Sequence, residues 1–328
     1  MEVGKQRKSG MMTAKPKCEV VNQYLEKLIS PFLGESYLIR AKIVHIPVDR
    51  LHHIAKIPAL PHNLKIETWE ELKDECKYPS AISFFPIHML SGFTKYILVS
   101  KRAFCNNCIL QLEKCKSAAF EAMYDFCPLE LYSGERHRMH SSIDSLIRDP
   151  HRNLRIFVDG NCVHDELSVL PREDLKTILF PGAPADVDTL ISVIACTLAV
   201  VLSDLLRAQK VDNIGIIRAF QYFQKLPLNI QRELTNKSNL LNRGGVSFLK
   251  RSDPRSLVER YLLAATMKDC SLMVSVRLVD HTQLSQMTNV IPTTNPKSAK
   301  NLENAYRRFV NGVEAIRANP KIHKPCCV

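Results

Sequence analysis

A change of hydrophobic period around Asp269 requires a helix to be followed directly by a strand. Upstream of Asp269, apolar side chains recur at helical spacing after Pro254, and proline suits the first turn of a helix. From Leu272 to Leu278, apolar side chains occupy alternate positions, as they do along a strand. This pattern predicts that Asp269 lies on a short helix-to-strand connection.

The position of Asp269 is compatible with two roles. A carboxylate between two rigid elements can face a cleft, and that geometry suits a general base. Aspartate is also a common turn residue, and the spacing alone favours this structural role, with Lys268 beside it in solvent. The choice between the two roles depends on the rest of the chain.

Two strings of residues resemble the inositol-pentakisphosphate 2-kinases. Residues 265–273 are similar to that family's A-K-D-C-S-I-M segment, which carries the catalytic aspartate. Residues 126–134, followed after a helix by residues 153–157, are similar to the family's C-P-L-D-L-Y-S-G and N-N-L-K-I-F strings. Because two dissimilar strings occur in the family's order, the chain is identified as a member of this family, with a likeness from about residue 20 to about residue 278.

The resemblance implies an α+β fold of the two-lobed inositol-polyphosphate-kinase type. It also implies transfer of the γ-phosphoryl group of ATP, with Mg²⁺, to the 2-hydroxyl of inositol pentakisphosphate. In that reaction Asp269 would accept the hydroxyl proton. Lys114 falls on a substrate-binding lysine of the family, and Arg152 and Asn153 fall on a pair of asparagines, so these three would hold substrate phosphates. Without the resemblance, Lys114 is a solvated helix lysine and Asn153 a residue that caps a turn.

Three segments depart from the family pattern. No strand–glycine-loop–strand pattern precedes the first helix, where the family covers the ATP phosphates. His88 and Leu90 stand where the family has two substrate-binding lysines. No aspartate follows Asp280, whereas the family has a magnesium-binding D-L-D-L-K-P segment there. We therefore expect very slow turnover or none, and an inactive or truncated member that only binds inositol phosphates is the alternative function.

The formal net charge of +12 fits an anionic partner, which could be nucleic acid, an acidic membrane or a phosphorylated small molecule. A basic nucleic-acid- or membrane-binding protein is therefore a second alternative. The chain has no helix-turn-helix, zinc-finger or RNA-binding pattern, so we expect no specific nucleic acid among its partners. The expected partners are inositol pentakisphosphate and ATP, bound by a monomer.

The longest uncharged run, residues 189–203, is about 15 residues, whereas a bilayer span needs roughly 20. We expect a buried helix there and no membrane span. Eleven cysteines without a disulfide framework, and no apolar signal segment, indicate a reducing compartment, the nucleus and cytoplasm.

Cys105 and Cys108 have a C-x-x-C spacing that is compatible with zinc. Cys115, Cys127 and His137 could complete a site, but no second pair follows at the customary spacing. The segment also resembles the family's C-R-Y-C-M-H-Q, which begins a helix, and we assign no metal ligand.

The patterns divide the chain into four parts. They are a disordered basic tail (1–17), a reduced N-terminal lobe (18–100), a larger, mostly helical lobe with the site (101–280), and a divergent basic tail (281–328). Helices are predicted over residues 20–29, where Pro31 would end the helix, over 139–147, over 190–206, and over 299–318 between unstructured ends, with a hairpin over 154–163. Residues 211–215 also resemble a family string, L-D-I-E-G, that precedes a helix.

Overall fold

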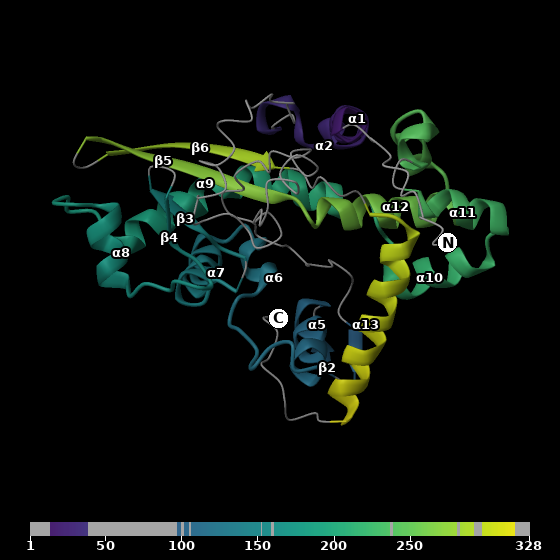
Figure 1. The fold of residues 1–328 in the computed structure, drawn as a ribbon, viewed down its shortest axis with the longest axis horizontal. Coiled ribbons are helices and arrows are strands. Elements are labelled where there is room, and N and C mark those ends of the chain that lie inside the picture. The colour runs from purple at the N-terminus through teal and green to yellow at the C-terminus, as the bar shows by residue number, and fades with distance from the viewer. Residues whose placement is uncertain are drawn as a thin grey trace, which may run out of the picture.

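The computed structural model describes residues 14–38, 97–99, 102–104, 106–151, 153–158, 161–236, 239–280, 283–291 and 297–318. In this part of the chain, helices dominate and the strands form three separate two-stranded antiparallel sheets (Figure 1). This content is consistent with the predicted α+β class. Residues 39–96, which include His88 and Leu90, and residue Cys105 lie outside the described residues.

The helices are α1 (Ala14–Tyr24), the π-helical turn η1 (Leu25–Ile29), α2 (Ser30–Leu33), η2 (Glu35–Tyr37), α5 (Asn106–Lys116), α6 (Pro128–Leu131), α7 (Arg136–Arg148), α8 (Arg172–Leu179), α9 (Val187–Gln209), α10 (Gly215–Lys225), α11 (Leu228–Thr235), η5 (Asn239–Arg243), η6 (Val246–Lys250), α12 (Pro254–Met267) and α13 (Ala299–Ala318). The strand pairs are β1 (Ile97–Val99) with β2 (Arg102–Phe104), β3 (Ile156–Val158) with β4 (Asn161–His164), and β5 (Ser271–Asp280) with β6 (Gln283–Ile291).

Helix α9 contributes to the main core along most of its length. Its N-cap, Asp186, accepts a hydrogen bond from the Thr189 amide at 2.7 Å, and the helix packs against α2, α7, α12 and β6. The predicted helix is therefore confirmed, although Val200 is 62 % exposed. By length and composition this one described helix could also cross a bilayer, and 44 % of its most apolar window is buried against the rest of the chain.

Helix α12 and strand β5 confirm the predicted change of period. Asp253 caps the helix through the Ser256 amide at 3.0 Å, and Pro254 occupies the first turn. The helix ends at Met267 and β5 begins at Ser271, so Asp269 lies on the short connection between them.

A fully buried carboxylate also anchors α12 from the side. Glu259 is 0 % exposed. It accepts charge-assisted hydrogen bonds from Arg255 at 3.0 Å and from Arg243 at 3.2 Å. Since both arginines reach the same side chain, the helix that carries the junction is tied to η5.

The chain after Asp280 is not a tail with one helix between unstructured ends. Strand β6 pairs with β5 from Ile291 opposite Ser271 to Gln283 opposite Asp280, and the hairpin extends along α9 (Figure 1). Strand β6 has a largely polar sequence, so its apolar period is weak and only the pairing with β5 reveals it.

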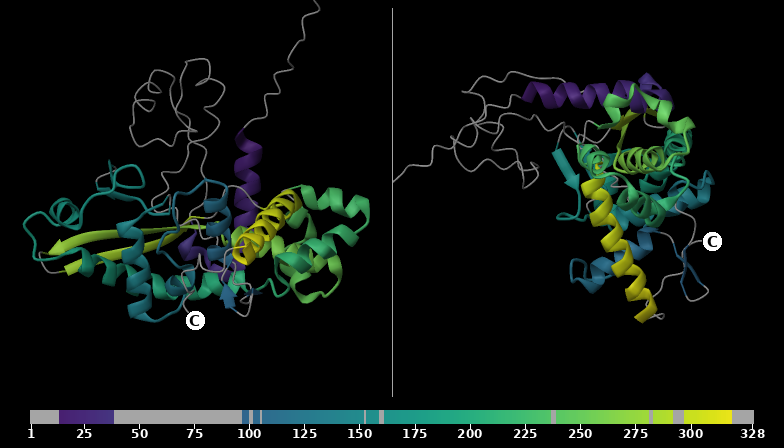
Figure 2. Two further views of the ribbon diagram at one scale, coloured as in Figure 1. Left: turned by 90° about the horizontal axis from the view of Figure 1, so that it is seen from below. Right: turned by 90° about the vertical axis from the view of Figure 1, so that its right-hand side faces the viewer.

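Helix α13 has the predicted bounds and belongs to the core. It runs beside α5, as the right-hand view of Figure 2 shows, and its Phe309 is buried. The two helices approach closely at Gly312, where a methyl group would collide with the Ile109 carbonyl. The predicted division of the chain near residue 100 stays a prediction.

The N-terminal helix begins earlier and continues further than predicted. Residues 14–17 belong to α1 rather than to a disordered tail. Pro31 does not end the helix but lies in the first turn of α2, where its missing N–H needs no partner. The predicted apolar stripe is buried, with Tyr24 and Leu28 in the main core.

Helix α7 and the β3–β4 hairpin match their predictions closely. The helix ends at Arg148, directly before Asp149 and Pro150. The hairpin pairs Phe157 with Cys162 and contains a register shift next to Ile156.

Candidate functional site

Asp269 combines a fixed backbone with a partly exposed side chain. Its amide donates to the Thr266 carbonyl at 3.0 Å, which holds the connection after α12 in place. Its carboxylate is 19 % exposed and forms an ion pair with Lys297, whose side chain is 22 % exposed. Lys297 lies two residues before α13 and was not predicted as a site residue. The junction therefore presents a carboxylate and a cation together at the surface.

A buried glutamine joins the two family-like strings in space. The Gln209 side-chain amide donates to the Tyr132 hydroxyl at 3.0 Å and to the Met267 carbonyl at 3.4 Å. Burial raises the pKa of Tyr132 well above its ordinary value, so this hydroxyl stays protonated. The string that contains Tyr132 is thus connected through α9 to the end of α12.

Lys268 is buried and only 8 % exposed, which corrects the expectation of a solvated lysine. Burial lowers its pKa, and the nearby Asp212 carboxylate opposes that shift by electrostatic attraction. Asp212 also accepts hydrogen bonds from the amides of Ile214 at 3.1 Å and Gly215 at 3.0 Å, at the start of α10. The Lys268 side chain is therefore enclosed by the protein and is not available at the surface of the junction.

Lys114 lies in the last turn of α5 and reaches an aromatic cluster. Its Nζ atom is 4.3 Å from the centre of the Phe120 ring, within cation–π distance. The Phe120 ring centre is in turn 5.2 Å from that of His151. His151 is two residues before Asn153, so two predicted phosphate-binding residues lie in one neighbourhood.

The turn that carries Asn153 is held in an unusual backbone conformation. His151 has a φ of 45°, in the left-handed region, its ring lies 4.1 Å from the Tyr124 ring, and its Nε2 atom is 3.1 Å from the Asp149 carboxylate. Asn153 is 6 % exposed, and its amide donates to the Pro150 carbonyl at 2.7 Å. Arg152 lies outside the described residues.

The segments that carry Asn153 and Asp269 share one apolar wall. Leu154, next to Asn153, and Leu272, three residues after Asp269, line the same cavity between α7 and α9. The two segments are therefore neighbours in the core. That Lys114, Asn153 and Asp269 surround one ligand stays a prediction.

Asp280 does not supply Asp269 with a second carboxylate for magnesium. No three His, Cys, Asp or Glu side chains gather in the part of the chain that the structure describes. Asp280 ends the 10-residue strand β5. At about 3.3 Å per residue it lies roughly 30 Å along the strand from the junction, too far to share an ion with Asp269.

Cys108, the second cysteine of the C-x-x-C spacing, is buried beside Met123 and Leu129.

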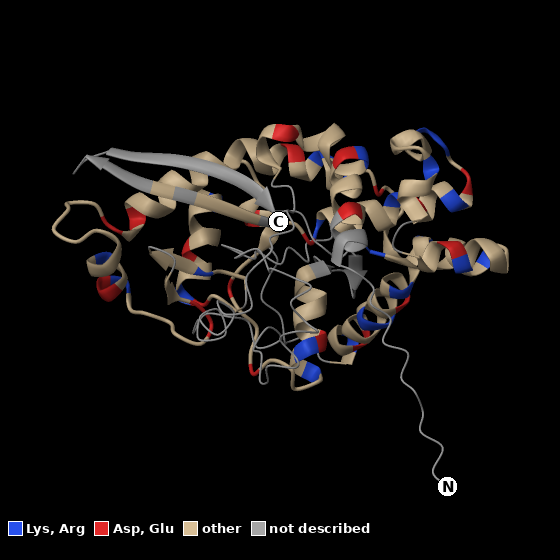
Figure 3. Ribbon diagram, turned by 45° about the horizontal axis from the view of Figure 1, so that its top comes forward, with Lys and Arg blue, Asp and Glu red and all other residues tan. Residues whose placement is uncertain are grey.

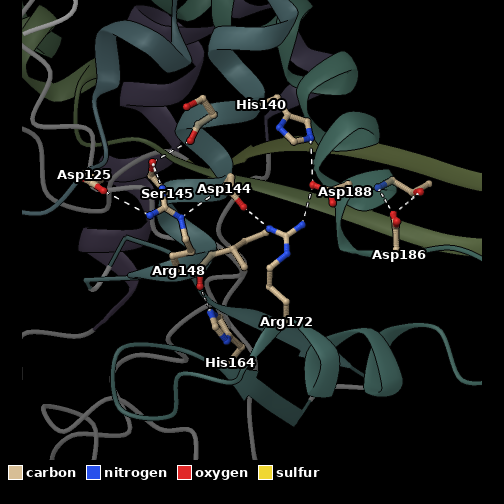
Figure 4. A network of polar contacts seen from close by, with 12 residues as sticks. Asp125, His140, Asp144, Ser145, Arg148, His164, Arg172, Asp186 and Asp188 are labelled. Carbon is tan, nitrogen blue, oxygen red and sulfur yellow. Dashed lines mark hydrogen bonds and ion pairs between the residues drawn. The ribbon is translucent and has the colours of Figure 1, made fainter.

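Charged side chains elsewhere form structural pairs. In Figure 3, Lys and Arg are interspersed with Asp and Glu along the described elements. Figure 4 shows Arg172 of α8 joining Asp144 of α7 to Asp188 of α9, and Arg148 pairing with Asp144 at 3.1 Å. The pairs of Arg172 connect α7, α8 and α9 to one another, which is a structural role.

Comparison with known proteins assigns the family. The family model for inositol-pentakisphosphate 2-kinase matches residues 91–311, more than half of the chain. The chain belongs to the inositol-pentakisphosphate 2-kinase family. The match includes β6 and much of α13, so the expectation that the likeness ends near residue 278 was wrong.

Three relatives show how the likeness is distributed. Inositol-pentakisphosphate 2-kinase IPK1 of Oryza sativa subsp. indica is 30 % identical over 165 residues, which cover 47 % of this chain and 37 % of the relative. The inositol-pentakisphosphate 2-kinase of Danio rerio is 23 % identical over 164 residues, covering 44 % and 34 %. That of Arabidopsis thaliana is 23 % identical over 311 residues, covering 82 % and 68 %. The chain therefore matches little more than a third of the rice relative's length.

Proposed function

We propose that this chain binds a highly phosphorylated inositol beside Asp269, in a two-lobed fold of the inositol-polyphosphate-kinase type. The reaction for which the site is arranged is transfer of the ATP γ-phosphoryl group to the 2-hydroxyl of inositol pentakisphosphate, which gives the hexakisphosphate. The observation that carries the proposal is that separate family-like strings converge on the α12–β5 junction, where Asp269 is partly exposed next to Lys297.

In this proposal Asp269 accepts the proton of the attacking hydroxyl. Lys114, Arg152 and Asn153 hold substrate phosphates, and Lys297 adds a cation at the reacting end. A ligand with many phosphates needs cations in fixed positions, since phosphoryl transfer depends mainly on positioning and charge stabilisation. The proposal also includes a monomer in the nucleus and cytoplasm.

A second candidate function is binding without turnover. The position of Asp280 at the far end of β5 favours it, because Asp280 then cannot hold a magnesium ion together with Asp269. The family implies ATP with Mg²⁺, which would supply charge neutralisation at the phosphates. No three His, Cys, Asp or Glu side chains gather among the described residues, and we assign that ion no ligands.

Calorimetry with inositol hexakisphosphate at a low and a high salt concentration tests the binding site. We expect salt-dependent binding that Lys114→Ala and Lys297→Met each weaken about fivefold or more, as the loss of one charge-assisted contact implies. The control is Lys225→Ala at the exposed end of α10, which removes the same charge elsewhere. Equal losses in all three variants would show that only net charge matters, and the site assignment would fail.

Conversion of labelled ATP in the presence of inositol pentakisphosphate and magnesium separates the two functions. Slow turnover that Asp269→Asn abolishes supports the kinase. No turnover, with hexakisphosphate binding intact, supports the binding-only function.

A further inference from the structure

The hydroxyl of Thr266, in the last turn of α12, joins three separate parts of the chain. It donates to the Leu262 carbonyl of its own helix at 2.9 Å. It accepts from the Tyr24 hydroxyl of α1 at 3.2 Å and from the Lys297 amide at 2.9 Å, across 242 and 31 residues of sequence respectively. A hydroxyl has one proton and two lone pairs, so these three bonds use its full capacity.

The backbone carbonyl of Thr266 holds Asp269, the acidic member of the partly exposed ion pair. The Thr266 carbonyl accepts from the Asp269 amide at 3.0 Å and from the Cys270 thiol at 3.8 Å. One residue thus fixes the main chain of Asp269 through its carbonyl and the main chain of Lys297 through its hydroxyl. Thr266 is 0 % exposed and cannot touch a ligand itself.

The hydrogen bonds of Thr266 limit the movement of Lys297, which the ion pair with Asp269 alone does not. Asp269 precedes β5 and Lys297 follows β6, so both flank the open end of the hairpin, where Ser271 pairs with Ile291. A lysine side chain loses up to about 2 kcal/mol of conformational freedom when it is held in one position. A fixed Lys297 backbone reduces the number of positions that its ammonium group can reach. The contact from Tyr24 adds α1 to the same support, and burial keeps that phenol protonated by raising its pKa.

We infer that Thr266 is a positioning residue that sets Lys297 against Asp269, with Tyr24 supporting it from α1. The inference rests on the proposed function, because it assigns Thr266 to the site proposed above. The competing interpretation is an ordinary helix threonine whose hydroxyl only bonds the carbonyl four residues earlier. That interpretation gives the hydroxyl no influence on Lys297.

Two variants of nearly equal shape separate the interpretations. Thr266→Val replaces the hydroxyl by a methyl group, whereas Thr266→Ser keeps the hydroxyl and removes a methyl group. We expect the Lys297 amide to exchange with solvent at least about fivefold faster in Thr266→Val than in wild type, and inositol hexakisphosphate to bind about fivefold more weakly, as the loss of one buried hydrogen bond implies. Thr266→Ser keeps both properties.

A third variant tests how much Tyr24 contributes to holding Thr266. Tyr24→Phe removes one donor to Thr266 but leaves the Lys297 amide bonded, so binding should fall less than in Thr266→Val. Thr266→Ala replaces Thr266→Val if the latter does not fold. The solvent-exchange rate of the Lys297 amide can also be measured in the wild-type protein alone. If that amide is not protected from exchange, the inference is overturned.

The outcomes distinguish this inference from the proposed function. If wild type does not bind inositol hexakisphosphate, the proposed function fails and takes the inference with it. If wild type binds, Lys297→Met weakens binding and a folded Thr266→Val binds as wild type does, only the inference fails.

Discussion

The α12–β5 junction is held by buried side-chain hydrogen bonds, whereas the turn at His151 is held by backbone hydrogen bonds, tilted ring contacts and a contact with the Asp149 carboxylate. At the junction, Thr266 and Gln209 have their polar groups inside the protein, where an unmade hydrogen bond is costly. Around His151, the Phe120 and Tyr124 rings lie tilted against a histidine whose side chain is 24 % exposed. The difference teaches that the backbone of the predicted base is fixed from inside the core, whereas the turn that carries Asn153 also depends on contacts of a partly exposed side chain.

The largest effect is expected on the junction side, at Glu259. Glu259→Ala removes the carboxylate that pairs with Arg243 and Arg255 and leaves both guanidinium groups without it, which should lower the free energy of unfolding by about 3–5 kcal/mol. Urea unfolding measures the change. Glu259→Gln, which keeps the shape and one acceptor, is the control, and equal losses in the two variants would contradict an electrostatic cause.

His164 in the β3–β4 hairpin, which follows the turn at His151, should make the stability of the protein depend on pH. His164 accepts from the Leu170 amide through Nδ1 at 3.1 Å, so Nε2 carries the proton that bonds the Ile147 carbonyl at 3.0 Å. Burial lowers the pKa of His164 below its ordinary value of 6.5. The neutral ring is therefore favoured in the folded state, and its contribution to the free energy of unfolding is fully present above pH 6.5.

As the pH falls from 6.5 towards the folded-state pKa of His164, the unfolded chain takes up a proton that the folded chain does not. Stability should then fall by at most about 1.4 kcal/mol per pH unit. Urea unfolding at several pH values, compared with His164→Gln, isolates this residue. A slope that is the same in both proteins would assign the pH dependence to other groups.

A smaller effect is expected at His151. His151→Ala removes the tilted ring contacts and the contact with the Asp149 carboxylate and keeps the left-handed backbone, so we expect the free energy of unfolding to fall by about 1 kcal/mol. His151→Gly removes the same side chain but tolerates the backbone and should be more stable than alanine. Thermal unfolding of both variants provides the test, and glycine less stable than alanine would argue against backbone strain at this turn.

The smallest effect is expected at Arg148, which serves as the reference for both regions. Its side chain is 52 % exposed and pairs with Asp144 at 3.1 Å and Asp125 at 3.5 Å. Exposed pairs of this kind contribute about 0.5 kcal/mol or less, so Arg148→Ala should change the unfolding midpoint little. If Arg148→Ala lowered the free energy of unfolding as much as Glu259→Ala does, the network in Figure 4 would stabilise the fold more than exposed ion pairs usually do.

Local patterns in the sequence were enough for several elements. The period change at Asp269, helix α7, the β3–β4 hairpin and the bounds of α13 all follow from spacings within one element, and each is confirmed. Strand β6 was missed because its residues are mostly polar and its partner strand supplies the reason for its conformation. The continued N-terminal helix was missed because a π-helical turn allows Pro31 to begin a new helical turn.

By itself, the sequence determined the family and the position of Asp269 between a helix and a strand, because both depend on residues that are adjacent in the chain. Only the tertiary structure decided that Lys297 pairs with Asp269, that Lys268 is buried, and that Thr266 bonds to Tyr24. These contacts join segments that are far apart in sequence. No local period records them, since they arise when the helices and the hairpin pack together and bury the polar groups that must then find partners.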